Sequence, residues 1–570
     1  MRILLQQIAI GSFAAGLIAL SACTQKKTEP SNDEITAIDL KRGEVILCGP
    51  PEKEFGAVGF ESSCSQAVKE DFSLAIALLH SFEYDEAEKV FAKVIDKEPG
   101  CPLAYWGVAM ANYHPLWAPP TPEEFEKGSK AIAIARSLKP GSKKESDYID
   151  AIAVFYKDWQ KVDHATRSNN YEKAMEKLYA TYPDDKEAGI FYALALDGAA
   201  NPSDKTYAKQ KKAGDVLNAI YPDQPVHPGI IHYIIHSYDN PELAGLALSA
   251  ARKYASIAPS SAHAQHMPSH IFTRLGKWDE SISSNLVASS SAKCYGESTG
   301  IKGHWDEELH TLDYLIYAYL QRGDNLHAKQ QIDYLRSIKE VFPINFKVAY
   351  AFAAGPARYA LENKLWKEAA SHQLYPQTLE WEKYPWQKAI FHFAKLMGNV
   401  NINQLDSAKL ELRNLSQLHD TLTRQKDTYK ANQVQIQMKT GESWILFKQG
   451  KRDQGLALMS AAADLEDKTQ KHSVTPGEVI PARESLAEML MQMNKSVEAL
   501  KAYEAVLKQQ PNRFNALYGA AVASERIKNA EKAGQYYSQL LAISFTESTR
   551  PELGKAKEYL QSHDQGLTRR

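Results

Sequence analysis

Histidines return at a fixed interval in the middle of the chain. His232 and His236 recur 34 positions later as His266 and His270. Residues four apart share one face of a helix, so each pair can direct two imidazoles towards one point. Neutral imidazoles in that arrangement are typical ligands of Zn²⁺, Cu²⁺ or Ni²⁺. The spacing therefore indicates recognition by imidazole nitrogen, with a transition metal ion as one candidate ligand.

Three interpretations of these histidines are open. They can hydrogen-bond within a packed interior, because histidine is intermediate in burial. They can line a concave pocket for an anionic or polar ligand such as a peptide, with Arg274 as a further donor. They can also bind a metal ion, and the candidate ligands are then His232, His236, His266 and His270.

Catalysis is not indicated by the residues beside the two pairs. The chain has no H-E-x-x-H motif and no glutamate next to either pair that would serve as a general base. Asp239 and Asp313 are the carboxylates that could orient an imidazole or act as metal ligands. We therefore assign no catalytic residue.

The elements that must position these histidines follow a repeat visible near both ends of the chain. Ala487, Ala499 and Tyr503, in a unit from Ile480, recur in a unit from Phe514; the recurring residues are Ala521, Ala533 and Tyr537. Near the N-terminus the same spacing links Ala75, Ala87, Phe91 and Pro99. Small residues let paired helices approach closely, and the aromatic ring fills the gap between them. One helix pair cannot bury its apolar face alone, so the units must stack into a superhelix.

Both ends resemble the tetratricopeptide repeat (TPR) superfamily, and the whole mature chain resembles a family of bacterial secreted TPR proteins. The segments that carry this resemblance are Leu79-His80-Ser81-Phe82-Glu83-Tyr84, Ala104-Tyr105-Trp106-Gly107, His227-Pro228-Gly229, His266-Met267-Pro268-Ser269-His270-Ile271-Phe272 and Thr475-Pro476-Gly477. The resemblance implies an all-α, TPR-like α-solenoid of helix-turn-helix repeats in a right-handed superhelix. It implies no particular activity. Pro268 departs from the usual unit, because proline inside a helix interrupts it.

The same resemblance implies which side chains face the concave surface. They lie on the first helices of units that begin at Pro102, Pro228, Ala262 and Leu309. The candidate ligand-binding residues are Trp106, His114, His232, His236, His263, His266, His270, Arg274, His310 and Asp313.

Composition limits the classes of partner. The 67 basic and 69 acidic residues give a net charge of −2, so no basic face for nucleic acid is expected. With 44% hydrophobic and 10% aromatic residues, the chain has ample material for a packed core. We expect N-terminal repeats over 67–225, histidine-rich repeats over 226–345 and C-terminal repeats over 346–570.

The N-terminus has the pattern of a secretion signal. Arg2 precedes a largely apolar run that ends in Leu20-Ser21-Ala22-Cys23. This sequence resembles a bacterial lipobox, which implies removal of a signal peptide at 1–22, a lipid such as palmitate on Cys23 and a flexible tether over 23–40. Acyl chains would hold the protein on a membrane. Thr24 stands where an inner-membrane retention signal would have Asp, so we expect the outer membrane, on its periplasmic or surface side.

Four cysteines remain beyond Cys23. In a secreted protein Cys48 and Cys64 are expected to form a disulfide within an N-terminal segment at 41–66, worth about 3 kcal/mol. Cys101 is expected to be a small buried residue at a helix start, and its pairing with Cys294 is left open.

Together these features predict an outer-membrane-anchored scaffold that binds a partner protein, a peptide or a small ligand in its concave groove. The alternative is a metal-dependent enzyme or metal-binding protein that uses the central histidines.

Overall fold

The computed structural model describes residues 29–48, 54–116, 119–201, 204–469 and 471–567. The N-terminal half contains α1 (Asn32–Thr36), η1 (Gln66–Val68), α2 (Lys69–His80), α3 (Tyr84–Lys97), α4 (Pro102–Ala111), α5 (Pro122–Ser137), α6 (Lys143–Tyr156), α7 (His164–Thr181), α8 (Lys186–Gly198), α9 (Ala208–Ile220), η2 (Tyr221–Asp223), α10 (Pro228–Ser237), α11 (Ala244–Ile257), α12 (Ala262–His266), α13 (Pro268–Arg274) and α14 (Trp278–Thr299).

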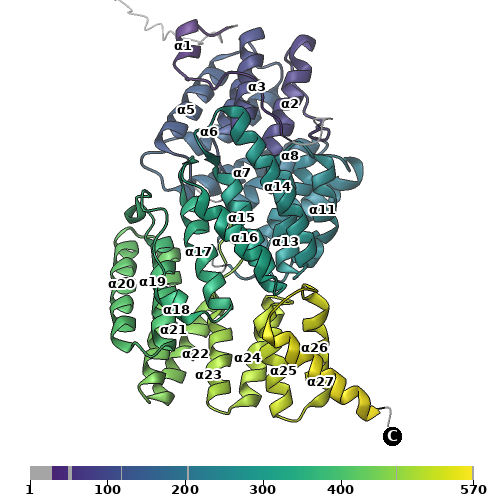
Figure 1. Ribbon diagram of the computed structural model, residues 1–570. Coiled ribbons are helices and arrows are strands. Elements are labelled where there is room, and N and C mark those ends of the chain that lie inside the picture. Colours follow the sequence, from purple (N-terminus) through teal and green to yellow (C-terminus); the bar gives the residue numbers. More distant parts are fainter. Residues whose placement is uncertain (1–28, 49–53, 117–118, 202–203, 470, 568–570) are drawn as a thin grey trace, which may run out of the picture.

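The C-terminal half contains β1 (His304–Trp305), α15 (Asp306–Gln321), α16 (Asn325–Ser337), β2 (Val341–Phe342), α17 (Phe346–Glu362), α18 (Trp366–Ala370), η3 (Trp381–Lys383), α19 (Pro385–Asn401), α20 (Leu405–Arg424), α21 (Thr428–Lys448), α22 (Arg452–Lys468), α23 (Ala482–Gln492), α24 (Ser496–Gln509), α25 (Phe514–Arg526), α26 (Ala530–Ile543) and α27 (Pro551–Leu567). The two short strands pair in parallel. The expected all-α, TPR-like α-solenoid is confirmed, because consecutive helices pack in pairs along the chain (Figure 1).

The predicted aromatic positions lie between helices, each against a glycine that the repeat pattern did not include. A Cβ added at Gly519 in α25 would lie 2.2 Å from the ring of Tyr503 in α24. Likewise, a Cβ at Gly107 in α4 would lie 2.3 Å from the ring of Phe91 in α3. The aromatic ring of one helix therefore rests on the bare backbone of the next, at both ends of the chain.

Buried apolar side chains form two large cores. One runs from Ile38 to Phe272 and the other from Trp278 to Ala523, with a small third core over Phe514–Ala556. Along the chain, the boundary between the two large cores falls at the turn around Gly276. The helices that carry the repeated histidines lie beside this junction, on α10 to α15.

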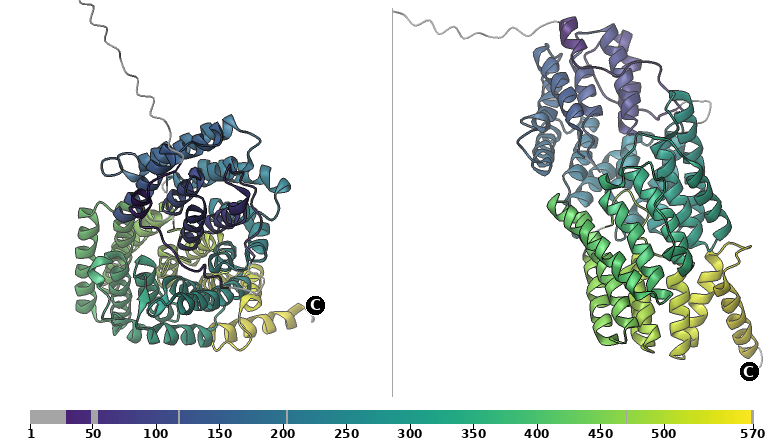
Figure 2. Two further views of the ribbon diagram at one scale, coloured as in Figure 1. Left: turned by 90° about the horizontal axis from the view of Figure 1, so that it is seen from above. Right: turned by 60° about the vertical axis from the view of Figure 1, so that its left-hand side comes forward.

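The C-terminal repeats turn back onto the middle of the chain. The backbone N–H of Phe545 donates to the carbonyl of Arg322 at 2.8 Å, and the indole N–H of Trp278 donates to the carbonyl of Asn512 at 2.8 Å. In the view from above, the C-terminal repeats lie beside helices from the middle of the chain (Figure 2, left).

The expected disulfide Cys48–Cys64 is wrong. Cys48 is bonded to Cys294, with Cα atoms 5.8 Å apart, and Cys64 to Cys101, with Cα atoms 5.4 Å apart. Residues 54–63 contact distant parts of the chain: Ala57 N–H donates to the carbonyl of Val226, and Ser63 N–H donates to the carboxylate of Glu145. These contacts hold Cys64 beside Cys101 and away from Cys48. Cys101 precedes α4 as expected, but as half of a disulfide.

The signal peptide, Cys23 and the first part of the tether lie outside the described residues. Among the helices that are described, none is both long and apolar enough to cross a membrane.

Candidate metal centre

Six histidines of α10, α12, α13 and α15 form two clusters. The first cluster is His232, His236 and His263, and the second cluster is His266, His270 and His310. Within each cluster the ligand atoms lie within 4.8 Å of one another. The four histidines predicted as metal ligands are thus divided between the two clusters, two in each, and each pair is joined by one further predicted ligand-binding residue, His263 or His310.

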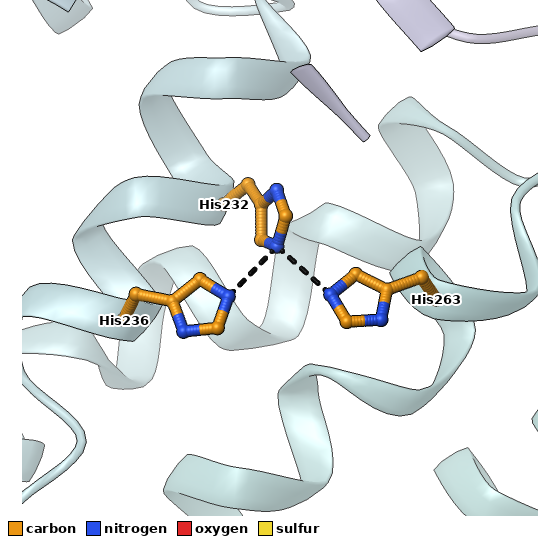
Figure 3. Close-up of side chains that lie close together, drawn as sticks. All are labelled: His232, His236 and His263. Carbon is orange, nitrogen blue, oxygen red and sulfur yellow. Dashed lines mark hydrogen bonds between the residues drawn. The ribbon is translucent and has the colours of Figure 1, made fainter. Parts of the chain in front are cut away.

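The first cluster is centred on His232 (Figure 3). Its Nε2 lies 3.0 Å from Nε2 of His236 and 3.1 Å from Nε2 of His263. Pro228 occupies the first turn of α10, where a missing N–H costs nothing, and so sets the start of the helix. From that start, His232 and His236 are one turn apart on the same face.

The second cluster spans a break between two helices. The expected single helix is divided at Met267, and Pro268 takes the first position of α13. His266 on α12 and His270 on α13 still converge, with their Nε2 atoms 3.0 Å apart. His310 on α15 lies beside His266, with ring centroids 4.3 Å apart and the ring planes tilted by 58°.

The hydrogen atoms of the central imidazoles are assigned by their outer partners. His266 Nδ1 lies 2.7 Å from Oδ1 of Asn285, whose amide nitrogen donates to the carbonyl of Ser281. His270 Nδ1 lies 3.0 Å from the carboxylate of Asp239. Both partners accept, so Nδ1 carries the hydrogen in each ring. In a neutral imidazole Nε2 then carries a lone pair, and the two lone pairs point towards each other. The hydroxyl of Tyr314 also lies 3.3 Å from Nε2 of His270.

Burial keeps these imidazoles neutral. His232 and His266 are almost fully buried, at 0% and 1% exposure. Burial lowers the pKa of His232 to about 3 and holds the pKa of His266 well below its usual range. Burial also places the pKa of His310 well below the ordinary value. Neutral imidazole is the form that binds metals.

Asp239 is the charged group nearest the second cluster. Its carboxylate accepts from the guanidinium of Arg274 at 2.8 Å as well as from His270. Burial alone would raise the pKa of Asp239, but Lys471 and Arg274 hold it below its usual range. Burial lowers the pKa of Lys471 to about 7, with Arg274 adding to the effect. The expectation that Asp239 could orient an imidazole matches this geometry.

A cavity of about 360 Å³ lies against both clusters. His236 and His263 of the first cluster and His270 and His310 of the second are among the residues that line it. The opposite walls come from distant parts of the chain, including Lys347, Tyr429, Lys471 and His472. Both clusters therefore border one shared cavity.

A third group, His80, Glu187 and His227, differs in kind. Nε2 of each histidine lies 3.0 Å from one oxygen of Glu187, and Nδ1 of His80 lies 2.9 Å from the hydroxyl of Tyr233. The carboxylate accepts from both rings, so their Nε2 atoms carry hydrogens rather than free lone pairs. None of the three lines the cavity. This is a buried hydrogen-bond network that fixes the end of α2.

Four further predicted ligand-binding residues are engaged within the protein. Trp106 is packed in the N-terminal core against Phe191, and His114 lies 3.0 Å from the carboxylate of Glu124. Asp313 forms a buried ion pair with Arg358, and Arg274 is bound to Asp239. These four do not line the cavity, because each first-helix face also has to pack against a neighbouring helix.

Sequence reasoning missed the outer partners of the histidines. Asn285 belongs to α14, and the backbone carbonyl of His80 accepts from Nδ1 of His232 at 2.7 Å. Neither position carries a signal in the sequence, since an isolated asparagine and a backbone carbonyl have no pattern. His80 itself is part of the segment that carries the TPR resemblance.

Comparison with known proteins supports the class of fold. Residues 485–544 match the family model of the tetratricopeptide repeat, which covers the two units predicted from Ile480 and Phe514. No curated protein matches the chain.

Two solved structures are similar to it at low overall score. A complex of Naa15 and Naa10 bound to HypK-THB has 11% identity and a TM-score of 0.25, covering 88% of this chain and 92% of that one. An APC/C hetero-tetramer of Cut9 and Hcn1 has 13% identity and a TM-score of 0.30, covering 87% and 89%. At these scores we take no function from either. The protein is thus an all-α, TPR-like α-solenoid with tetratricopeptide repeats at 485–544.

Proposed function

We propose that this TPR-like scaffold binds a divalent transition metal ion at the second cluster, through His266, His270 and His310. The observation that carries the proposal is the pair of Nε2 lone pairs 3.0 Å apart, each fixed by an acceptor on the opposite side of its ring. Lone pairs at that distance repel unless a cation lies between them. Histidine ligands held from behind by an amide or carboxylate oxygen are the usual arrangement around protein metal ions.

The ligand set favours a particular class of metal. Three neutral imidazoles suit Zn²⁺, Cu²⁺ or Ni²⁺, whereas Mg²⁺ and Ca²⁺ prefer oxygen ligands. Three protein ligands also leave one coordination position open, and the cavity is the space on which it would open. A metal-dependent enzyme would use that position for water or substrate.

Metal content of purified protein is the test. After dialysis against Zn²⁺, Cu²⁺ or Ni²⁺ we expect at least one tightly bound ion per chain, with nitrogen ligands in X-ray absorption. The double variant His266→Gln/His270→Gln should lose that ion. The matched control His392→Gln/His419→Gln also removes two histidines, but from α19 and α20, and should keep it. A metal-free native protein, or an unchanged metal content in the first variant, would reject the proposal.

A small organic ligand is a second candidate for the cavity. Its volume of about 360 Å³ is that of a pocket for a small molecule, and Lys347 and Lys471 are among its lining residues. A partner protein, which the repeat scaffold suggests, would then bind on other surfaces. Calorimetry of the metal-free protein with inorganic phosphate and simple carboxylates measures the binding of such small ligands. If none of them gives a heat of binding, a metal ion remains the proposed ligand of the cavity.

We also propose that the protein is anchored to the outer membrane by a lipid on Cys23. The support is the sequence Leu20-Ser21-Ala22-Cys23 after an apolar run. Cys23→Ala should move the protein from the membrane fraction to the soluble fraction. Membrane association that survives this change would refute the anchor.

A further inference from the structure

In the first cluster the hydrogen of the central imidazole is also assigned by an outer partner. Nδ1 of His232 donates to the backbone carbonyl of His80, so Nε2 of His232 is a lone pair. That Nε2 lies 3.0 Å from Nε2 of His236 and 3.1 Å from Nε2 of His263. Two nitrogen ligands at 2.0–2.1 Å from a tetrahedral ion are roughly 3.3 Å apart. His232 is therefore spaced from each of the other two rings nearly as one metal ligand is from another, and the three ligand atoms all lie within 4.8 Å of one another.

The two clusters are neighbours in the fold. His263 belongs to the first cluster and His266 to the second, and both are on α12. Residues three apart on a helix have Cβ atoms about 5–6 Å apart. The clusters also share the cavity, which His236 and His263 line from the first and His270 and His310 from the second.

An aromatic side chain covers the first cluster. The ring of Phe82 lies 4.3 Å from that of His232, 5.5 Å from that of His236 and 5.6 Å from that of His263, between centroids. Phe82 has a positive φ of 59°, at a turn between helices where Gly276 and Gly323 occupy equivalent conformations elsewhere. A bulky residue in this conformation is uncommon and costs backbone energy, and such strain concentrates at functional sites.

We propose that the first cluster is a second site for a divalent transition metal ion, and that the two ions form a pair whose open positions face the shared cavity. This inference rests on the proposed function of the second cluster. Three imidazoles per ion leave each ion a position for a further ligand. A small molecule in the cavity would then contact both ions together.

Titration of the full-length, metal-free protein with Cu²⁺ tests the pair. We expect two ions per chain and an electron paramagnetic resonance spectrum broadened by coupling between them. The variant His236→Gln/His263→Gln changes the two half-buried ligands of the first cluster and should bind one ion with an uncoupled spectrum. His310→Gln in the second cluster should behave in the same way. Circular dichroism of each variant shows whether it is folded, and the single variant His236→Gln replaces the double variant if that one is not.

Each outcome bears on one of the two proposals. If His236→Gln/His263→Gln binds as many ions as the native protein, the second site is rejected and the second cluster stands. If the native protein binds two ions whose spectrum is the sum of the two variant spectra, both sites exist but the pair is rejected. If His310→Gln binds as many ions as the native protein while the variants of the first cluster lose theirs, the proposed function itself fails.

Discussion

At the scale of single residues, the candidate site depends on side chains that would not contact the metal ion themselves. Asn285 and Asp239 accept from Nδ1 of His266 and His270, and so decide which nitrogen carries the lone pair. Removing such a partner typically lowers metal affinity 10–100-fold. The residues behind the rings therefore determine which nitrogen of each imidazole is available to a metal ion.

Asn285→Ala tests this positioning role. We expect metal affinity, measured by competition with a chelator, to fall about 10–100-fold because His266 is no longer held in one tautomer. Asn399→Ala is the matched control, since Asn399 is also buried and donates to the carbonyl four residues earlier, at Lys395. Both variants should lose similar stability without metal. Equal metal affinity in the two would show that Asn285 has only a structural role.

The burial of His372, which lies outside both histidine clusters, leads us to expect a lower free energy of unfolding in acid. Burial lowers its pKa to about 4 from an ordinary 6.5, with Arg336 and Lys395 adding to the effect. As the pH falls, His372 is therefore protonated in the unfolded chain before it is protonated in the folded protein. The contribution of neutral His372 to the free energy of unfolding is complete above pH 6.5 and is lost as the pH falls towards 4.

His372→Gln removes that proton uptake. Between pH 7 and pH 4 the variant should lose less free energy of unfolding than the native protein, by on the order of 3 kcal/mol. Urea unfolding at each pH measures the difference. His563→Gln, at an exposed position, should follow the native protein. Parallel curves for the native protein and His372→Gln would contradict the assignment.

At the scale of elements, two interruptions of regular structure matter most. Pro268 divides the helix between His266 and His270, and the extended segment before α2 lies across helices that are far apart in the sequence. Cys48 and Cys294, 246 residues apart, join this segment to α14. Cys64 and Cys101, 37 residues apart, join it to the start of α4.

The disulfide pairing is directly testable. Peptide mapping of non-reduced protein should yield Cys48 linked to Cys294 and Cys64 linked to Cys101. Either Cys294→Ser or Cys101→Ser should cost about 2–4 kcal/mol, because each bond restricts a long loop in the unfolded chain. Thermal unfolding with and without reductant measures the loss. Recovery of a peptide that links Cys48 to Cys64 would overturn the pairing.

At the scale of the whole molecule, the site exists because the superhelix returns on itself. The cavity beside the histidines of α10 to α15 is completed by Lys347 of α17 and by the segment from Lys471 to Val474. The site also lies near the junction of the two large cores, a common place for ligand pockets. Contacts between distant helices therefore hold the walls of the cavity together.

Arg513 is a buried contact of this kind. It is fully buried, and its guanidinium donates to Glu484 of α23 at 2.7 Å and to Glu362 of α17 at 2.5 Å. Arg513→Met would leave two buried carboxylates without their cation and should cost about 3–5 kcal/mol. Arg526→Met, at an exposed position of α25, should change stability by about 0.5 kcal/mol or less. Chemical denaturation compares them, and a similar loss in both would contradict the role of Arg513.

The repeat architecture could be predicted from the sequence because it is a local property. Ala487, Ala499 and Tyr503 recur at one spacing, and that spacing alone requires paired helices with a small residue against a ring. The one-turn separation of His232 and His236, and of His266 and His270, is local in the same way. It was enough to place these histidines on common faces.

The tertiary structure decided which of those faces meet and what each histidine can do. His310 joins His266, Asn285 orients it, and Cys48 reaches Cys294 only through contacts across tens to hundreds of residues. Such contacts leave no periodic trace in the chain, because they depend on the curvature accumulated over many helix pairs. Packing between neighbouring helices buried Trp106 in the N-terminal core. Helices that are far apart in the sequence supply opposite walls of the cavity, because a small rotation at each repeat determines which distant helices come together.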